Sequence, residues 1–206
     1  MKNIISDWSG VISDDFYIVF STANAILSSY GKKTATQKEF RETFDLPYLD
    51  FYKSRGINAT KEEIDERFEK FRKKFGNANP NPEARKVLEY LKSNAISVIV
   101  LTSAPQSEIN EEMARYGFSD YFHKVYAGVH DKINALKKIK EGNGFSSGNT
   151  LYLDDLPHGM RAGKDAGLFT LGIQSKFSEK RRLRKAGADD VIDNLGELVK
   201  VIREII

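Results

Sequence analysis

The sequence has no cysteine, only three histidines and no long apolar run. Without cysteine, disulfide bonds, thiol catalysis and cysteine-ligated zinc are excluded. The histidines, at positions 123, 130 and 158, lack the spacing of metal ligands, so a metal here would be bound by oxygen. No stretch approaches the roughly 18 apolar residues of a membrane span, and none has the pattern of a signal peptide. We therefore expect a cytoplasmic protein that does not insert into membranes.

Positively and negatively charged residues are nearly balanced. The chain has 32 Lys and Arg residues against 29 Asp and Glu residues, a formal net charge of +3. Its densest basic stretch, residues 180–185, contains a leucine and has no interleaved aromatic residues on which bases could stack. Such a stretch is typical of the solvated face of a short helix. We therefore expect no nucleic-acid partner.

What the sequence does have is a regular alternation of apolar strands and amphipathic helices. The predicted strands are 2–7, 96–102, 124–127, 150–154, 169–173 and 190–192. The helices expected between and after them are 83–93, 107–116, 131–140, 157–166 and 195–206. Strands that are separated by helices form parallel sheets covered on both faces. The pattern predicts an α/β fold with a doubly wound, Rossmann-like parallel sheet.

Residues 14–80 interrupt this pattern, because they show helical spacing throughout. They carry 12 of the 23 aromatic residues, enough for a small core of their own. Thr60 and Glu63 have the spacing of a capping box, and the two prolines of 77–82 indicate a hinge. The sequence therefore predicts an α/β core of residues 1–13 and 81–206, with a helical cap, 14–80, inserted after the first strand.

Carboxylates follow two of the predicted strands. Asp7 comes directly after the first, and Asp154 and Asp155 end the strand at 150–154. Ligands of open α/β sheets bind beyond the carboxyl ends of the strands, where these residues would meet. Capping of a turn or of the helix at Pro157 is the alternative. Three carboxylates in one crevice would repel each other, and a magnesium ion would offset the repulsion.

Hydroxyl groups and one lysine complete the set of polar side chains. Thr102 and Ser103 follow the strand at 96–102 and precede a helix, which is a suitable place to bind phosphate. Lys132 opens a helix, where a cation opposes the helix dipole. An anionic substrate would favour it there; an exposed lysine beside Asp131 is the alternative.

Four stretches of the chain together resemble a known family. They read DWSGV, VIVLTSAP, the lysine that opens the helix at 132, and LYLDDLPHGMRAGKDAGLFTLGI. In this order they resemble the haloacid dehalogenase (HAD) superfamily, in the branch with a helical C1-type cap that includes phosphoglycolate phosphatases and β-phosphoglucomutases. The resemblance covers nearly the whole chain and implies a hydrolase of phosphate esters.

The resemblance also implies roles for individual residues. In the family, the first aspartate attacks phosphorus and forms an aspartyl-phosphate that water then hydrolyses. The residues implied to be catalytic are Asp7, Thr102 and Lys132. The implied magnesium ligands are Asp7, Ser9 through its backbone carbonyl, Asp154 and Asp155. The residues expected to contact the substrate are Trp8, Ser9, Ser103 and, from the cap, Tyr48.

Ser9 departs from the pattern of family phosphatases, which have an aspartate here that protonates the leaving oxygen. A serine cannot act as this acid, and losing such help costs about 10²- to 10⁴-fold in rate. A good leaving group could make the acid unnecessary, or Asp14, Asp15 or His158 could replace it. The third possibility is a protein that binds a phosphorylated ligand with little or no turnover.

Trp8 and the small residue after it also resemble the phosphonoacetaldehyde hydrolase branch, in which a cap lysine forms a Schiff base. Lys53 is the candidate for that lysine, with an exposed surface lysine as the alternative. The dehalogenase branch needs no metal, and the acidic pair 154–155 argues against it. The prediction is a magnesium-dependent phosphatase that acts as a monomer on a small phosphorylated metabolite. A C–P bond hydrolase and a weakly active phospho-ligand-binding protein are the rival hypotheses.

Overall fold

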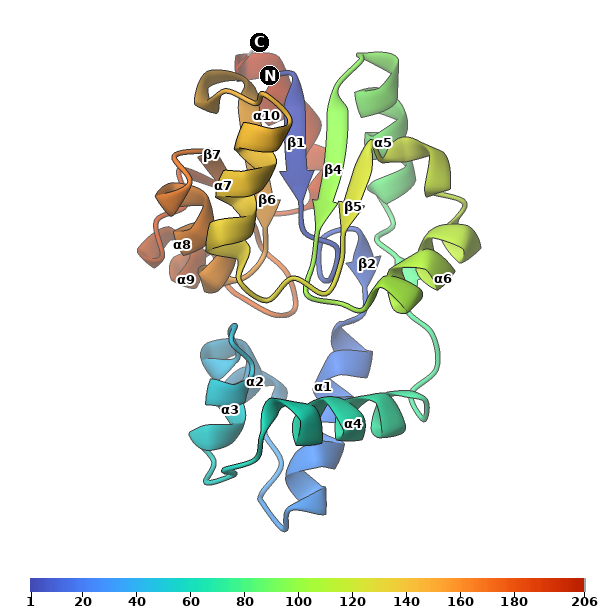
Figure 1. Cartoon of the computed structure of the whole chain (residues 1–206), viewed down its shortest axis with the longest axis vertical. Coiled ribbons are helices and arrows are strands. Elements are labelled where there is room, and N and C mark those ends of the chain that lie inside the picture. Colours follow the sequence, from blue (N-terminus) through green and yellow to red (C-terminus); the bar gives the residue numbers. More distant parts are fainter. Residues whose placement is uncertain (206) are drawn as a thin grey trace.

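A six-stranded parallel sheet forms the centre of the larger part of the molecule (Figure 1). The computed structural model describes residues 1–205. The strand order is β5-β4-β1-β6-β7-β8. The bounds are β1 (Asn3–Ser6), β4 (Ser97–Leu101), β5 (Lys124–Tyr126), β6 (Thr150–Asp154), β7 (Phe169–Ile173) and β8 (Asp190–Ile192). The sheet confirms the predicted doubly wound α/β fold.

Both faces of the sheet are buried, because successive residues of a strand point to opposite faces. Ile4 and Val98 belong to one apolar cluster, and their neighbours Ile5 and Ile99 belong to another. Residues of α5 (Ala84–Ser93), α6 (Gln106–Tyr116) and α10 (Leu198–Ile205) complete the first cluster. Residues of α7 (Lys132–Gly142) and α8 (Pro157–Asp165) complete the second. The unbroken apolar strands of the sequence follow from this two-sided burial.

The remaining core elements are short. A helix, α9 (Lys180–Lys185), packs Leu183 against Met160 and Val191, so the basic stretch is the outer face of a helix, as expected. The 3₁₀ turns are η1 (Ser119–Tyr121), η2 (Ser147–Asn149) and η3 (Leu195–Glu197). The helix predicted for 195–206 therefore starts as a 3₁₀ turn, and its last residue lies outside the described part of the chain. No helix within residues 1–205 combines the length and apolar composition needed to span a bilayer.

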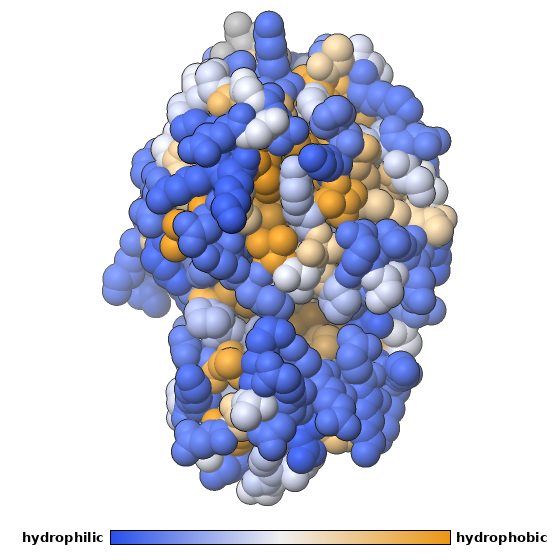
Figure 2. Space-filling view, viewed as in Figure 1, coloured by the Kyte–Doolittle hydropathy of each residue, from blue (hydrophilic) through white to orange (hydrophobic). Residues whose placement is uncertain are grey.

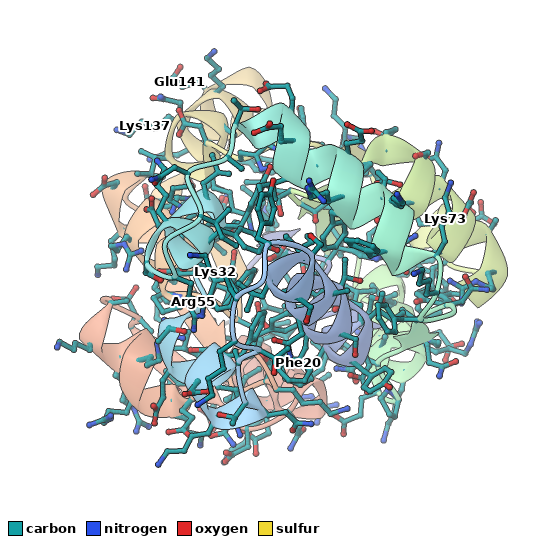
Figure 3. The ribbon with its side chains drawn as sticks, turned by 90° about the horizontal axis from the view of Figure 1, so that it is seen from below. Phe20, Lys32, Arg55, Lys73, Lys137 and Glu141 are labelled. Carbon is teal, nitrogen blue, oxygen red and sulfur yellow. The ribbon has the colours of Figure 1, made fainter. Side chains whose placement is uncertain are left out.

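The smaller part of the molecule is helical and lies beyond the carboxyl ends of the central strands (Figure 1). It contains α1 (Phe16–Ser29), α2 (Gln37–Thr43), α3 (Leu49–Lys53) and α4 (Lys61–Arg72). Seen from below, α1 and α4 lie side by side (Figure 3). Both α2 and α4 begin with a capping box, the latter at Thr60 and Glu63. The four helices share an apolar cluster around Phe40, which Leu156 and Phe177 of the core also join.

Two short strands connect the parts. Strand β2 (Ser13–Asp14) pairs antiparallel with β3 (Asn79–Pro80), so both crossings of the chain lie side by side. Asn81 strengthens this junction, because its Nδ2 donates a hydrogen bond to the carbonyl of Val11 at 3.0 Å. Within the hinge expected at 77–82, residues 79 and 80 are therefore paired with β2. We keep the proposed limits of the cap at residues 14 and 80.

Candidate active site

The three carboxylates that follow the strands lie together. In the register of β1 and β6, Ser6 lies opposite Leu153, so Asp7 and Asp154 leave the sheet side by side. Asp7, Asp154 and Asp155 are buried, and one oxygen from each lies within 4.8 Å of the others. Adjacent parallel strands thus bring together acidic groups that are nearly 150 residues apart in the sequence.

Lys132 lies between two of these carboxylates. Its Nζ is 2.8 Å from Asp7 Oδ2 and 2.8 Å from Asp154 Oδ2. Burial alone would lower the pKa of the ammonium group, but the charges of Asp154 and Asp7 outweigh it and raise the pKa above its usual value. Lys132 is buried, which excludes the alternative of an exposed lysine beside Asp131. The carboxylates of the protein itself explain why a cation occupies the first position of α7.

The two adjacent aspartates differ in their partners. Asp154 accepts hydrogen bonds from Lys132, from the hydroxyl of Tyr152 at 2.5 Å and, at its other oxygen, from the backbone N–H of Leu156 at 2.8 Å. Asp155 accepts one from Ser175 Oγ at Oδ2, 2.6 Å away. Among residues 1–205, its Oδ1 has no hydrogen-bond donor. Asp154 is thus occupied by the protein, whereas Asp155 keeps an oxygen available for a cation.

Two glycines make room for this arrangement. A Cβ atom on Gly159 would lie 2.1 Å from Asp154 Cγ, and one on Gly10 would lie 2.0 Å from Asp155 Oδ2. Gly10 also has a φ of +71°, which side chains of L residues rarely adopt. Tyr152, Ser175 and Gly159 were not singled out from the sequence. The sequence gives little indication of these three roles, because each residue supports the site through a contact that forms only in the folded chain.

The electrostatics of the cluster fit a divalent cation. Burial raises the pKa of Asp7 to about 6, with Lys132 opposing the shift and Asp154 adding to it. Burial and the charges of Asp154 and Asp7 raise the pKa of Asp155 well above its usual range. One lysine cannot neutralise three carboxylates, and oxygen donors are the ligands that Mg²⁺ prefers. Asp7 and Asp155 are the residues that could bind such an ion.

A cavity of about 350 Å³ opens above these residues, between the core and the cap. The space-filling view shows an apolar recess where the two parts meet (Figure 2). The predicted site residues that line the cavity are Asp7, Ser9, Tyr48, Ser103 and Asp155. The buried Thr102 follows β4, the neighbour of β1, and its Oγ1 accepts a hydrogen bond from the N–H of Ala104 at 3.2 Å.

Comparison with known proteins identifies the family. Residues 4–173 match the family model described as haloacid dehalogenase-like hydrolase. The chain belongs to the haloacid dehalogenase-like hydrolase family. It is 25% identical to a phosphorylated carbohydrates phosphatase of Thermotoga maritima, with 100% of this chain and 100% of the relative covered. It is 19% identical to a phosphoglycolate phosphatase of Synechococcus elongatus, with 100% of this chain and 99% of the relative covered.

Solved structures agree with this family assignment at the level of the fold. A haloacid dehalogenase-like family hydrolase from Streptococcus pneumoniae superposes with a TM-score of 0.82 at 16% identity, with 98% of each chain covered. A hydrolase from Pseudomonas syringae gives a TM-score of 0.82 at 16% identity, with 100% of each chain covered. The predicted family, fold and hydrolase class are confirmed, and the names of the curated relatives agree with a phosphoric monoester hydrolase.

Ser9, the residue that departs from the family pattern, has a carboxyl partner. Its Oγ donates a hydrogen bond to Asp15 Oδ2 at 2.6 Å, and the N–H of Gly10 donates to Oδ1 at 3.1 Å. Asp15 is buried and lines the cavity, whereas Asp14 and His158 do not line it. Burial, with a smaller contribution from the charges of nearby glutamates, raises the pKa of Asp15 to about 8, although the hydrogen bond from Ser9 opposes this.

Two other predicted residues lie away from the cavity. Trp8 packs in the core: its Nε1 donates to Glu112 Oε2 at 2.6 Å, and its ring is stacked 6.0 Å from that of Tyr116. This placement does not agree with the expected contact between the Trp8 side chain and substrate, because the side chain packs in the apolar cluster between the sheet and α6. Lys53 is exposed on α3 and does not line the cavity, so nothing in its placement favours a Schiff base.

The cap contacts the core through polar groups that sequence reasoning missed. Asp45 accepts hydrogen bonds from the N–H of His158 at 3.0 Å and from Arg161 at 2.7 Å. Arg72, at the end of α4, pairs with Glu108 of α6. Both pairs join residues that are far apart in the chain, and no motif marks them. They hold the cap over the cavity.

Proposed function

We propose that the protein is a magnesium-dependent phosphatase that hydrolyses a phosphate monoester of a small metabolite through an aspartyl-phosphate at Asp7. The observation that carries this proposal is the buried carboxylate of Asp7, in contact with Lys132 and close to Asp155, at the floor of an open cavity. The family and the phosphatases among its relatives support it.

Positioning and electrostatics account for most of the chemistry that we propose. The N–H of Trp8 donates to Asp7 Oδ1 at 2.8 Å and orients the carboxylate. An oxygen of Asp7 forms a bond to phosphorus as the bond from phosphorus to the leaving oxygen breaks, and water later cleaves the acyl phosphate. Thr102 and Lys132 bind the phosphoryl oxygens. A magnesium ion would be bound by Asp7, Asp155 and the backbone carbonyl of Ser9, with Asp154 assisting. It would neutralise the negative charge that develops on the phosphoryl oxygens.

We further propose that Asp15 supplies the proton that the leaving oxygen needs. Ser9 would donate its hydroxyl proton to the leaving oxygen and take one from Asp15. In the second step the same pair would remove a proton from the attacking water. The direct hydrogen bond between Ser9 and Asp15 and the place of both residues in the cavity wall support this role.

Replacing Asp15 by Asn tests this role. We expect the kcat/KM for alkyl phosphates to fall about 10²- to 10⁴-fold, because their leaving groups need a proton. The leaving group of an acyl phosphate needs none, and kcat/KM does not include the later hydrolysis of the aspartyl-phosphate, so the kcat/KM of acetyl phosphate should fall less than tenfold. In the wild type, the rate for alkyl phosphates should decline above about pH 8, where Asp15 loses its proton, and the variant should lack this decline.

Phosphate release against pH is the measurement, and Asp14→Asn, at the exposed neighbour that pairs with Lys176, is the matched control. The charges of Glu108 and Glu112 also act on the pKa of Asp15. A decline near pH 8 that persists in Asp15→Asn would assign it to another group. Equal losses for alkyl and acyl phosphates would contradict the proton-donor role.

Magnesium binding has its own expected result. Saturating Mg²⁺, at about 100 times its Kd, should add about 2.7 kcal/mol to the free energy of unfolding, or about 5 to 10 °C in Tm. Asp155→Asn should remove most of this shift. Without metal the variant should melt above the wild type, because the raised pKa of Asp155 lowers the stability of the fold at pH values above the pKa that this carboxyl has in the unfolded chain.

Thermal unfolding with Mg²⁺ and with EDTA measures both effects. Asp165→Asn, at the exposed end of α8, is the control and should keep the full shift. A wild-type protein with the same Tm in Mg²⁺ and in EDTA would overturn the magnesium proposal.

A second candidate, a phospho-ligand-binding protein with little turnover, is favoured by Ser9 at the position of the usual acid. A screen of phosphomonoesters, acyl phosphates and phosphonates with Mg²⁺ separates the two. Release of phosphate from at least one monoester supports the enzyme, and binding without release from any compound supports the second candidate.

A further inference from the structure

We propose that the substrate is the phosphate monoester of an alcohol that has an apolar body and no second anionic group. This inference rests on the proposed phosphatase function. Its basis is the wall of the cavity on the side of the cap, where the leaving alcohol would lie. Apolar residues of three cap segments form this wall, among them Val19 of α1, Leu46 of the loop between α2 and α3, and Ile64 and Phe68 of α4.

No cation faces this part of the cavity. Within residues 1–205, no lysine or arginine lines the cavity, and its charged side chains are all acidic. Besides Asp7 and Asp155 they are Asp15, Asp65, Glu69 and Glu108. Three cationic residues labelled in the view from the cap side, Lys32, Arg55 and Lys73, belong to the outer loops of the cap and the end of α4 (Figure 3).

Two cations of the cap are paired with acidic residues of the cavity wall. Lys61 pairs with Asp65 at 2.5 Å, and Arg72 pairs with Glu108. His130, the histidine in the wall, lies edge-on to the ring of Tyr48, 5.6 Å between centroids. Burial and the neighbouring lysines lower its pKa, so at neutral pH it carries no charge that could pair with an anion.

The consequence for substrates is direct. A carboxylate or a second phosphate on the alcohol would lose its water next to acidic groups, without a partner to offset the cost. A methylene or ring carbon would instead be removed from water, which favours binding about fourfold for each methylene. We therefore expect poor activity on phosphoglycolate, although a Synechococcus relative is named for it.

A series of aryl phosphates that differ in one charge tests the inference. The kcat/KM of the wild-type enzyme with Mg²⁺ is measured for phenyl phosphate, 4-carboxyphenyl phosphate and 4-(aminomethyl)phenyl phosphate. We expect the carboxylated ester to be at least 50-fold poorer than phenyl phosphate, and the amine to be within tenfold of it. The carboxylate makes the phenolate a slightly better leaving group, so intrinsic reactivity works against this order.

Acetyl phosphate separates failure of the inference from failure of the proposed function, because its small leaving group does not extend into the cap. If acetyl phosphate is hydrolysed and the carboxylated ester equals or exceeds phenyl phosphate, the substrate class is wrong and the phosphatase stands. If no compound releases phosphate, the proposed function fails and the inference fails with it.

A single substitution should change the preference. Val19 is partly buried on α1 and lines the cavity, so Val19→Lys would add a cation to the wall. We expect the ratio of kcat/KM for the carboxylated ester over phenyl phosphate to rise at least tenfold. Val19→Met, of similar length without the charge, should keep the wild-type order. A lysine variant with the wild-type ratio and full activity on acetyl phosphate would contradict the inference.

Discussion

An Asp7→Asn enzyme is expected to release phosphate from any ester at least about 10⁴-fold more slowly than the wild type. The amide cannot attack phosphorus, so the covalent step is lost. The fold should remain, because the amide can still accept the hydrogen bond from Trp8 and Lys132 keeps its ion pair with Asp154. The measurement is kcat from phosphate release in Mg²⁺, together with the Tm.

The control is Asp14→Asn, which changes an exposed carboxylate of β2 and should keep nearly full activity. Metal-dependent activity of Asp7→Asn within tenfold of the wild type would rule out the nucleophile and with it the proposed mechanism. A large loss together with a collapsed Tm would point to a structural role, which the retained hydrogen bond argues against.

Lys132→Met is expected to lower the free energy of unfolding by about 3 to 5 kcal/mol in the absence of metal. The substitution leaves the carboxylates of Asp7 and Asp154 buried without their cation, and breaking a buried ion pair costs this much. For a chain of this length the loss corresponds to roughly 6 to 20 °C in Tm. Thermal unfolding in EDTA at neutral pH measures it.

A second substitution should partly restore stability. In Lys132→Met/Asp154→Asn one of the unpaired charges is removed, so the double variant should melt above the single variant. Lys137→Met is the matched control, since Lys137 is an exposed lysine on the same helix (Figure 3). If Lys132→Met and Lys137→Met melt at the same temperature, the ion pairs of Lys132 do not contribute to stability. The explanation given for a cation at the first position of α7 would then be wrong.

The strands and their polar ends could be predicted from the sequence because both depend on local patterns. Continuous apolar runs end in Asp7, Thr102 and the pair 154–155, and parallel strands must bring these ends to one edge of the sheet. The pairing of β2 with β3 could not be predicted, since each strand has two residues and no period can be read from so short a segment.

Side-chain directions were harder to predict than positions. Trp8 was expected at the substrate, but its indole donates a hydrogen bond to Glu112, 104 residues away in the sequence. Lys132 was expected to contact an anionic substrate, and in the structure its partners are the carboxylates of Asp7 and Asp154. Asp15 was one of three candidates for the missing acid. Its contact with Ser9 depends on the turn at Gly10, whose geometry the sequence does not specify.

From the paired ribbon of β2 and β3 we further infer that the proposed cap is a separable module. Asp14 and Asn79 lie opposite each other, so the chain enters and leaves the cap at adjacent points, and a tight turn between them could take the place of more than sixty residues. The catalytic, metal-binding and substrate-binding residues of the proposed site all belong to the α/β core, except Asp15 and Tyr48, which belong to the cap. Exchange of the whole insertion would therefore change the specificity and keep the catalytic residues of the core, provided that the new cap supplies a carboxyl group at position 15 and again shields Leu156 and Phe177 from water.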